Sequence, residues 1–126
     1  MNSNNHKHIL IVDDESSIRA LLKHALEDFH NYQVILAADG HTALDFLKLQ
    51  HFDLVLTDWC MNGMNGLELA KLVRILSPET QILLMTGSDV TDFDDQARAL
   101  LAGLIKKPFT LSLVIKTIGH VMNHQA

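Results

Sequence analysis

Five polar side chains in this sequence follow short apolar runs, and their chemical types suit one reaction. They are Asp13 and Asp14 after "HILIV", Asp58 after "LVLT", Thr86 after "QILLM" and Lys107 just beyond "LI". Three carboxylates in contact repel one another unless a cation joins them, and Mg²⁺ binds carboxylate oxygens while leaving positions for phosphate oxygens. A carboxylate can also be the nucleophile toward phosphorus, with metal, amine and hydroxyl groups placed around the transferred oxygens. These residue types therefore predict magnesium-dependent phosphoryl transfer, provided that the fold brings them together.

Five short apolar runs alternate along the chain with stretches of helical period. The runs are "HILIV" (8–12), "QVILA" (33–37), "LVLT" (54–57), "QILLM" (81–85) and "LI" (104–105). They are rich in Ile, Val and Leu without polar alternation, which is typical of parallel strands covered on both faces. This alternation predicts a single α/β domain over residues 1–126, a flavodoxin-like (βα)5 doubly wound parallel sheet of strand order 2-1-3-4-5.

The predicted strand order places the five polar residues on one edge of the sheet. In such folds the ligand crevice lies at the carboxyl ends of the first and third strands, where the winding direction reverses. Asp13, Asp14 and Asp58 follow those two strands, and Thr86 and Lys107 follow the two strands next along the chain. Each residue alone has an ordinary explanation, since aspartates cap helices or form turns and lysines are usually solvated. Their shared position at strand ends is what predicts a site.

The composition excludes several other classes of protein. The chain has 126 residues, 48% of them hydrophobic, and a net charge of -5, and its largest basic cluster is the pair Lys106 and Lys107. This charge disfavours binding to nucleic acid or to an anionic membrane. A single cysteine, Cys60, excludes an internal disulfide, and we see neither a secretion signal nor an apolar span long enough to cross a bilayer. We therefore expect a reduced, cytoplasmic compartment.

Four motifs, taken as a spaced set, resemble those of a known family. "ILIVDDE", "LVLTDWCMNGMNG", "LLMTG" and "KKPF" together resemble the receiver domain of two-component response regulators, in particular the chemotaxis-type single-domain receivers, over nearly the whole chain. The resemblance implies that Asp58 is the phosphoacceptor, that Asp14 binds Mg²⁺ directly, and that Asp13 binds it chiefly through water. It also implies a backbone carbonyl ligand from Cys60.

The same resemblance implies roles for the remaining site residues and for partner proteins. The Thr86 hydroxyl and the Lys107 ammonium would bind the phosphoryl group, and a cis peptide is expected before Pro108. A sensor histidine kinase or a histidine phosphotransfer protein would supply the phosphoryl group, small phosphodonors can also react, and the domain would hydrolyse its own aspartyl phosphate. It would act as a regulator and not as a turnover enzyme, binding a downstream protein through its fourth helix, fifth strand and fifth helix. The cognate kinase, the output target, the phosphoryl lifetime, the oligomeric state and the extent of the full protein stay open.

Three features depart from the family pattern. Asn62 stands where receivers usually have proline, and Leu104 stands where many carry a switch tyrosine or phenylalanine. The segment "FDDQARALLAGLI" (93–105) fits the usual fourth helix poorly. We therefore expect a smaller switching movement than in aromatic-switch receivers, centred on the loop 87–95.

Three alternatives compete with a working receiver. An aspartate-nucleophile phosphatase also uses Asp, Mg²⁺ and Lys, but the first motif of that family has a "DxDx" pattern. Here Asp58 is followed by Trp59 and Cys60. A flavin-binding electron carrier shares the sheet order, but the first loop "DDESS" is acidic where a flavin phosphate needs donors. A degenerate receiver that only docks is disfavoured by the intact set of five residues. A redox or zinc role for Cys60, and a metal site at His120 and His124, are weaker interpretations.

Overall fold

A computed structural model describes residues 6–61, 63–87 and 94–123, apart from the side chain of Phe29. Asn62, His124 and most of the loop 87–95, on which we based expectations above, therefore lie outside the described residues. Ten elements follow in chain order: β1 (His8–Val12), α1 (Ser16–His30), β2 (Gln33–Ala37), α2 (Gly40–Leu49), β3 (Leu54–Asp58), α3 (Gly66–Leu76), β4 (Gln81–Thr86), α4 (Asp95–Ala99), β5 (Gly103–Lys106) and α5 (Leu111–Asn123).

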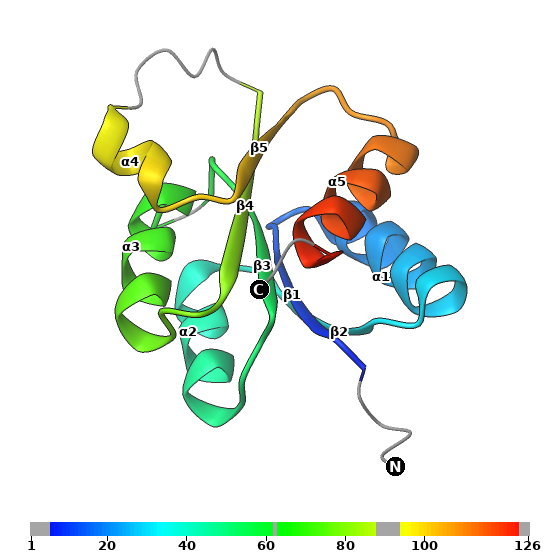
Figure 1. The fold of residues 1–126 in the computed structure, drawn as a ribbon, viewed down its shortest axis with the longest axis horizontal. Helices are drawn as coiled ribbons and strands as arrows, with labels where there is room; N and C mark the ends of the chain where they lie inside the picture. Colours follow the sequence, from blue (N-terminus) through cyan, green and yellow to red (C-terminus); the bar gives the residue numbers. More distant parts are fainter. Residues whose placement is uncertain (1–5, 62, 88–93, 124–126) are drawn as a thin grey trace.

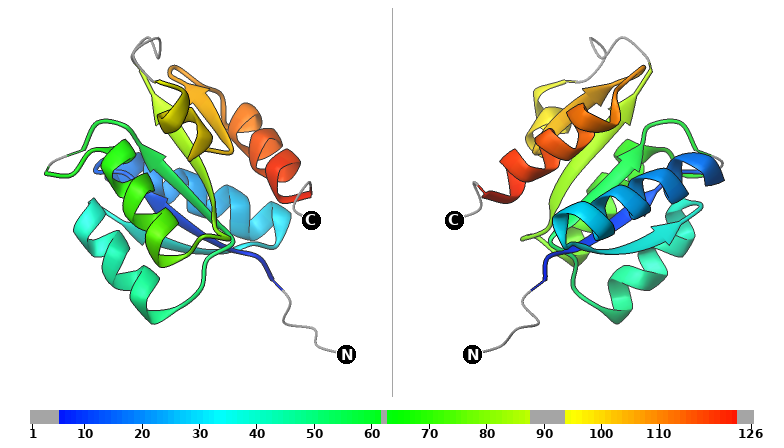
Figure 2. Two further views of the ribbon diagram at one scale, coloured as in Figure 1. Left: turned by 60° about the vertical axis from the view of Figure 1, so that its left-hand side comes forward. Right: turned by 90° about the vertical axis from the view of Figure 1, so that its right-hand side faces the viewer.

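The strands form one parallel sheet in the order β2-β1-β3-β4-β5, with α1 and α5 on one face and α2 and α3 on the other (Figures 1 and 2). Ile9 and Ile11 of β1 belong to the core beneath α1 and α5, while Leu10 and Val12 belong to the core beneath α2 and α3. Both faces of the strand are buried, which explains why the apolar runs lack polar alternation. The predicted flavodoxin-like fold and strand order are confirmed.

Three strands extend into the polar residues that follow the apolar runs. Asp58 is the last residue of β3 and pairs with Met85, and Thr86 is the last residue of β4 and pairs with Lys106. Backbone pairing does not depend on side-chain polarity, so the ladder continues past the apolar run. The segment that fits the usual fourth helix poorly forms a short helix, because α4 has only five residues.

The helix starts show which acidic residues are caps and which are not. Asn65 and Glu68 form a reciprocal capping box at the start of α3, and Asp39 caps α2 by accepting from Thr42 N. The N-cap of α1 is Glu15, whose side chain makes no capping hydrogen bond. Neither Asp13 nor Asp14 is therefore the N-cap of α1, so helix capping does not explain these two carboxylates.

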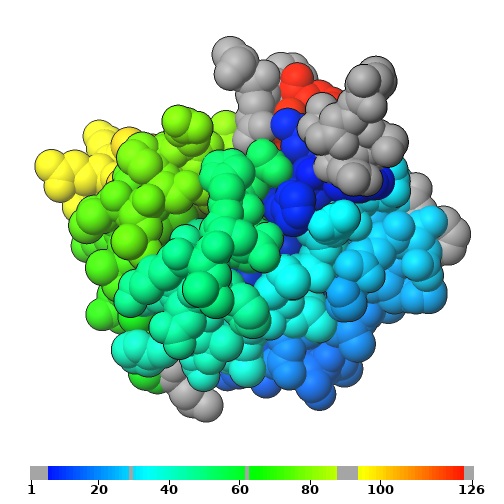
Figure 3. Space-filling view, turned by 90° about the horizontal axis from the view of Figure 1, so that it is seen from below, coloured from blue at the N-terminus to red at the C-terminus, as the bar shows by residue number. Residues whose placement is uncertain are grey.

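Hydrogen bonds join the strand starts at the amino end of the sheet, on the side of the molecule that Figure 3 shows from below. Asp53 Oδ2 accepts from His8 N at 2.9 Å, and its backbone oxygen accepts from Gln81 N at 3.0 Å. The buried Thr80 hydroxyl donates to Phe52 O at 2.7 Å. These contacts tie the starts of β1, β3 and β4 together, so that the strand ends at the opposite edge are held in fixed register.

The outer edge of the sheet at β2 is covered by side chains of α1. Glu27 Oε2 accepts from Val34 N at 3.2 Å and from Lys23 Nζ at 2.8 Å, and Lys23 Nζ also donates to Val34 O at 2.9 Å. The hydrogen bond from Lys23 holds the pKa of Glu27 below its ordinary value. Both backbone groups of Val34 on this edge strand are thus satisfied by α1.

None of the helices in the described ranges is long and apolar enough to cross a membrane.

Candidate functional site

Three carboxylates meet at the carboxyl ends of β1 and β3. One oxygen each from Asp13, Asp14 and Asp58 lies within 4.8 Å of the other two. Asp13 is fully buried, Asp58 is 6% exposed and Asp14 is exposed. The structure therefore brings together the three acids that the sequence placed at the reversal point of the sheet, with one carboxylate open to solvent.

Lys107 reaches the same place from the end of β5. Its Nζ lies 3.1 Å from Asp58 Oδ1, and its backbone N–H donates to Thr86 O at 2.7 Å. Thr86 is buried one residue beyond Met85, the strand partner of Asp58. The peptide between Lys107 and Pro108 is cis, as the family resemblance implied. All of the residues singled out at strand ends thus lie at one edge of the sheet.

Asp13 is the member of the acidic set whose burial and hydrogen bonding most clearly fit a bound cation. Its Oδ1 accepts from Glu15 N at 2.9 Å, whereas its buried Oδ2 has no hydrogen-bond partner among the described residues. Burial raises the pKa of Asp13 above its ordinary value, against the hydrogen bond from Glu15. The negative charges of Asp58 and Asp14 raise this pKa further, and the Lys107 ammonium opposes them. A buried carboxylate oxygen without a donor is costly, and a divalent cation is the partner that this acidic set fits.

Cys60 stands two residues beyond Asp58 and has an exposed, free thiol. The neighbouring Trp59 N donates to Met85 O at 2.7 Å, which prolongs the ladder past the end of β3. Over the described part of the chain, the acidic cluster is the single group of three or more His, Cys, Asp or Glu residues that could hold a metal. The structure thus offers no support there for a zinc site at Cys60 or His120.

Gly66, the first residue of α3, packs against the backbone at the end of β3, and its role was not predicted from the sequence. Its N–H donates to Trp59 O at 2.9 Å. A Cβ atom at this position would lie 2.4 Å from Asp58 O and 2.5 Å from Leu84 Cδ1. Glycine is a poor helix residue, so its place as the first residue of α3 was the available signal for close backbone approach.

We expect Gly66→Ala to destabilise the fold by roughly 1–3 kcal/mol, because the added methyl must displace the Asp58 backbone. Gly119→Ala is the matched control, since a Cβ there meets nothing within 4 Å in the middle of α5. That control should leave stability unchanged or raise it by about 1 kcal/mol through helix propensity. Urea titrations followed by circular dichroism measure both. Equal midpoints for wild type and Gly66→Ala would contradict the close approach.

Comparison with known proteins gives the fold and the site a family. Residues 9–119 match the family model described as the response regulator receiver domain. The chain is 40% identical over 123 residues to chemotaxis protein CheY-3 of Vibrio cholerae, which covers 94% of this chain and 93% of that protein. It is 35% identical over 104 residues to sporulation initiation phosphotransferase F of Bacillus subtilis, covering 82% of this chain and 83% of that protein.

A solved structure agrees with these relatives. The chemotaxis response regulator CheY4 of Vibrio cholerae superposes with a TM-score of 0.83 at 34% identity, covering 93% of this chain and 99% of that one. Family model, relatives and structure agree over nearly the whole chain. The chain belongs to the response regulator receiver domain family, and its function is phosphorelay signal transduction.

Proposed function

We propose that Asp58 is the phosphoacceptor of this receiver. The observation that carries the proposal is its position: a nearly buried carboxylate at the end of β3, paired with Lys107 and flanked by two further acids. Attack of an Asp58 oxygen on phosphorus would form the aspartyl phosphate. A stoichiometric, base-labile phosphate mapped to Asp58 by mass spectrometry tests the assignment, whereas steady turnover of a free phosphomonoester would favour a phosphatase.

Asp13, Asp14, Asp58 and the Cys60 backbone carbonyl are the groups that would hold Mg²⁺. When bound, the ion supplies positive charge toward the phosphoryl oxygens and neutralises the acidic cluster. The unpartnered Oδ2 of Asp13 and the raised pKa of that group support this assignment. The Lys107 ammonium would move its contact from the Asp58 carboxylate to an oxygen of the phosphoryl group. The Thr86 hydroxyl would donate a hydrogen bond to another phosphoryl oxygen.

A sensor histidine kinase or a histidine phosphotransfer protein would supply the phosphoryl group, and small phosphodonors would also react. The domain would then hydrolyse its own aspartyl phosphate, so its chemistry serves regulation and not substrate turnover. We further propose that residues 1–126 form a cytoplasmic receiver domain that binds neither nucleic acid nor membrane, in keeping with its net charge of -5.

The output surface would be the face formed by α4, β5 and α5, binding a downstream protein. A cavity of about 220 Å³ lies there, lined by Arg98, Leu101, Gly103 and Leu104. Phosphorylation would draw Thr86 and Lys107 inward and shift the population between two arrangements of this face. Leu104 has less area than an aromatic switch residue and no polar tip, so the rearrangement would be smaller.

We expect millimolar Mg²⁺ to stabilise the fold and to change the fluorescence of Trp59, which adjoins Asp58 and is the only tryptophan in the sequence. Binding of free ion at 100 times its dissociation constant would add about 2.7 kcal/mol to the free energy of unfolding. Thermal melts with and without Mg²⁺ at neutral pH measure the gain. A melting temperature that does not respond to the ion would count heavily against the acidic site.

Asp13→Asn should weaken the dependence of stability on Mg²⁺. The pKa of Asp13 is raised in the folded state, so this group favours folding below its ordinary pKa of 3.8, and that contribution is lost as pH rises through the folded-state value. At neutral pH the ionised Asp13 therefore destabilises the metal-free protein. Asn keeps the acceptor for Glu15 N, so the variant should melt higher than wild type without Mg²⁺ and gain less from it. Asp45→Asn, at an exposed position of α2, is the control and should respond to Mg²⁺ as wild type does.

A further inference from the structure

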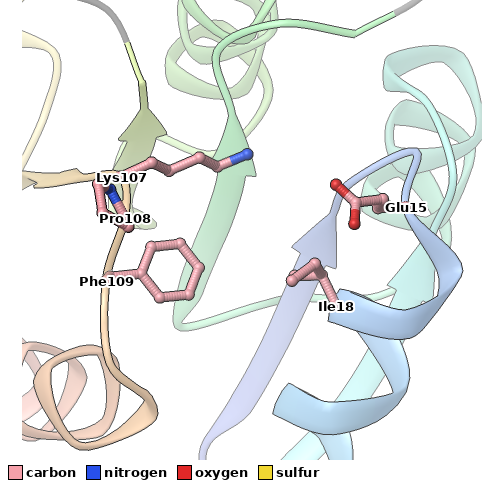
Figure 4. A pocket seen from close by; sticks show the side chains of 5 residues that line it. All are labelled: Glu15, Ile18, Lys107, Pro108 and Phe109. Atoms are coloured by element: carbon pink, nitrogen blue, oxygen red, sulfur yellow. The ribbon is translucent and has the colours of Figure 1, made fainter.

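The acidic site meets the two faces of the sheet in different ways. On the face of α1 and α5 a cavity of about 420 Å³ opens beside it (Figure 4). This cavity is lined by Glu15, Ile18, Lys107, Pro108 and Phe109. On the face of α2 and α3, by contrast, the β3–α3 loop (residues 59–65) packs against the core through Met61 and Met64. The position of this loop therefore depends on the elements that its methionines touch.

Met64 fits against Gly40, the first residue of α2. A Cβ atom placed on Gly40 would lie 2.8 Å from Met64 Sδ, 3.2 Å from its Cβ and 3.3 Å from its Cγ. The sulfur is near the far end of a flexible side chain and could swing aside, but Met64 Cβ is bonded to the loop backbone. The loop can therefore approach α2 this closely only because residue 40 has no side chain.

Backbone conformation does not explain the glycine at position 40. Gly40 is buried, and its φ lies outside the left-handed region, whereas Gly63 in the loop has a φ of 81°. Alanine is also a better helix former than glycine, so a helix start alone does not call for glycine here. What Gly40 provides is room for the Met64 side chain.

Two further contacts hold the loop on either side of Cys60. Met61 Sδ lies 3.8 Å from Oγ1 of the buried Thr57. The Gly66 N–H donates to Trp59 O at 2.9 Å and closes the base of the loop. The Cys60 thiol between them is exposed. The backbone of Cys60 is therefore positioned by its neighbours in the loop and not by its own side chain.

We propose that Met64, seated on Gly40, is a positioning residue for the Mg²⁺ site. The contact fixes the β3–α3 loop against α2, so that the Cys60 carbonyl is in place before the ion binds. Neither Met64 nor Gly40 is among the groups that would hold the ion. Their effect is to preorganise one of its ligands, as outer contacts commonly do for metal sites. The inference rests on the proposed role of the Cys60 carbonyl as a ligand.

Mg²⁺ titrations followed by Trp59 fluorescence test this inference, at a temperature where circular dichroism shows every variant to be folded. Gly40→Ala should bind Mg²⁺ about tenfold more weakly than wild type, as is typical when a contact that supports a metal ligand is disturbed. Met64→Ala should also bind the ion more weakly. In the Met64→Ala background, Gly40→Ala should have a further effect of roughly twofold or less, because the side chain that it displaces is absent.

Gly103→Ala is the matched control. A Cβ atom there would lie 3.2 Å from Leu83 Cδ2, so this variant also crowds the core, but at the start of β5 and far from the strand ends that form the site. Its Mg²⁺ affinity should equal that of wild type. Amide chemical shifts of the metal-free protein give a readout that does not depend on the ion. Gly40→Ala should shift the amide signals of Cys60 and Met61, and Gly103→Ala should leave them unchanged.

Wild-type affinity in both Gly40→Ala and Met64→Ala would overturn the inference and leave the metal site intact. Full additivity in the double variant would also overturn it, because Gly40 would then not act through Met64. So would an equal loss in Gly103→Ala, since crowding of the core in general would explain it. If Gly40→Ala does not fold, Met64→Ala decides the question, because it crowds nothing. A wild-type protein that does not bind Mg²⁺ would instead overturn the proposed metal site itself.

Discussion

Asp58→Asn should abolish covalent labelling by acetyl phosphate in the presence of Mg²⁺. An amide is not a nucleophile toward phosphorus, and no other carboxylate of the cluster has the same contact with the Lys107 ammonium, 3.1 Å from Asp58 Oδ1. The fold should survive, because Asn has nearly the same volume and its loss of charge lowers the repulsion among the acids. Intact-protein mass spectrometry measures the added phosphate directly.

Asp45→Asn is the control for this variant, because it removes one exposed carboxylate from α2 without touching the site. It should label as wild type does. Undiminished labelling of Asp58→Asn would show that the acceptor lies elsewhere, and the first places to look would be Asp13 and Asp14.

The second large effect is expected from Lys107→Ala, which should slow phosphorylation by roughly 100-fold or more. The ammonium is held in place before reaction by its contact with Asp58, and loss of one such prepositioned positive group typically costs this much in rate. The variant should also transmit less of the signal, because it removes the ammonium that would link the phosphoryl group to the backbone of residue 107, which is hydrogen-bonded to Thr86 O at the end of β4. Labelling time courses by mass spectrometry give the rate.

Lys106→Ala is a close control. Lys106 is exposed, and its replacement removes the same charge from the same strand end. Its rate should stay near that of wild type. A similar loss in both variants would mean that net charge, and not the position of the Lys107 ammonium, governs the reaction.

The transmitted signal can be followed by comparing amide chemical shifts with and without beryllofluoride. Large shifts confined to residues near Leu104, with no change in the loop 87–95, would contradict the smaller, loop-centred rearrangement.

Much of the fold and the position of the site could be predicted from residue order. The β1 run His8–Val12 and the β2 run Gln33–Ala37 agree with the structure residue for residue. The acids that follow β1 and the acid that ends β3 lie together because parallel strands place all their carboxyl ends at one edge. The position of each polar residue at the end of an apolar run is visible in the sequence. The regular strand order then places these residues at one edge of the sheet.

What could not be predicted depends on contacts between distant residues. The close approach of Gly66 to Asp58 O depends on the path of the turn between β3 and α3, which the sequence does not show. The cavity lined by Glu15, Ile18 and Phe109 forms only where the start of α1 meets the turn after β5, two segments far apart in the sequence. The sequence indicated an atypical fourth helix, but not that it would have only five residues with Ala97 as its buried residue.

The covering of β2 by Lys23 and Glu27 limits how this protein can polymerise. A sheet with two open edges can accept strands on both sides, and repeated addition gives an unbounded fibre. Here the backbone N–H and C=O of Val34 at one edge are already bonded to α1. If two copies met through their β5 edges, the pairing would use one edge of each copy and close on itself as a two-fold dimer. Replacing both Lys23 and Glu27 with alanine would leave the two backbone groups of Val34 open to the strand of another copy.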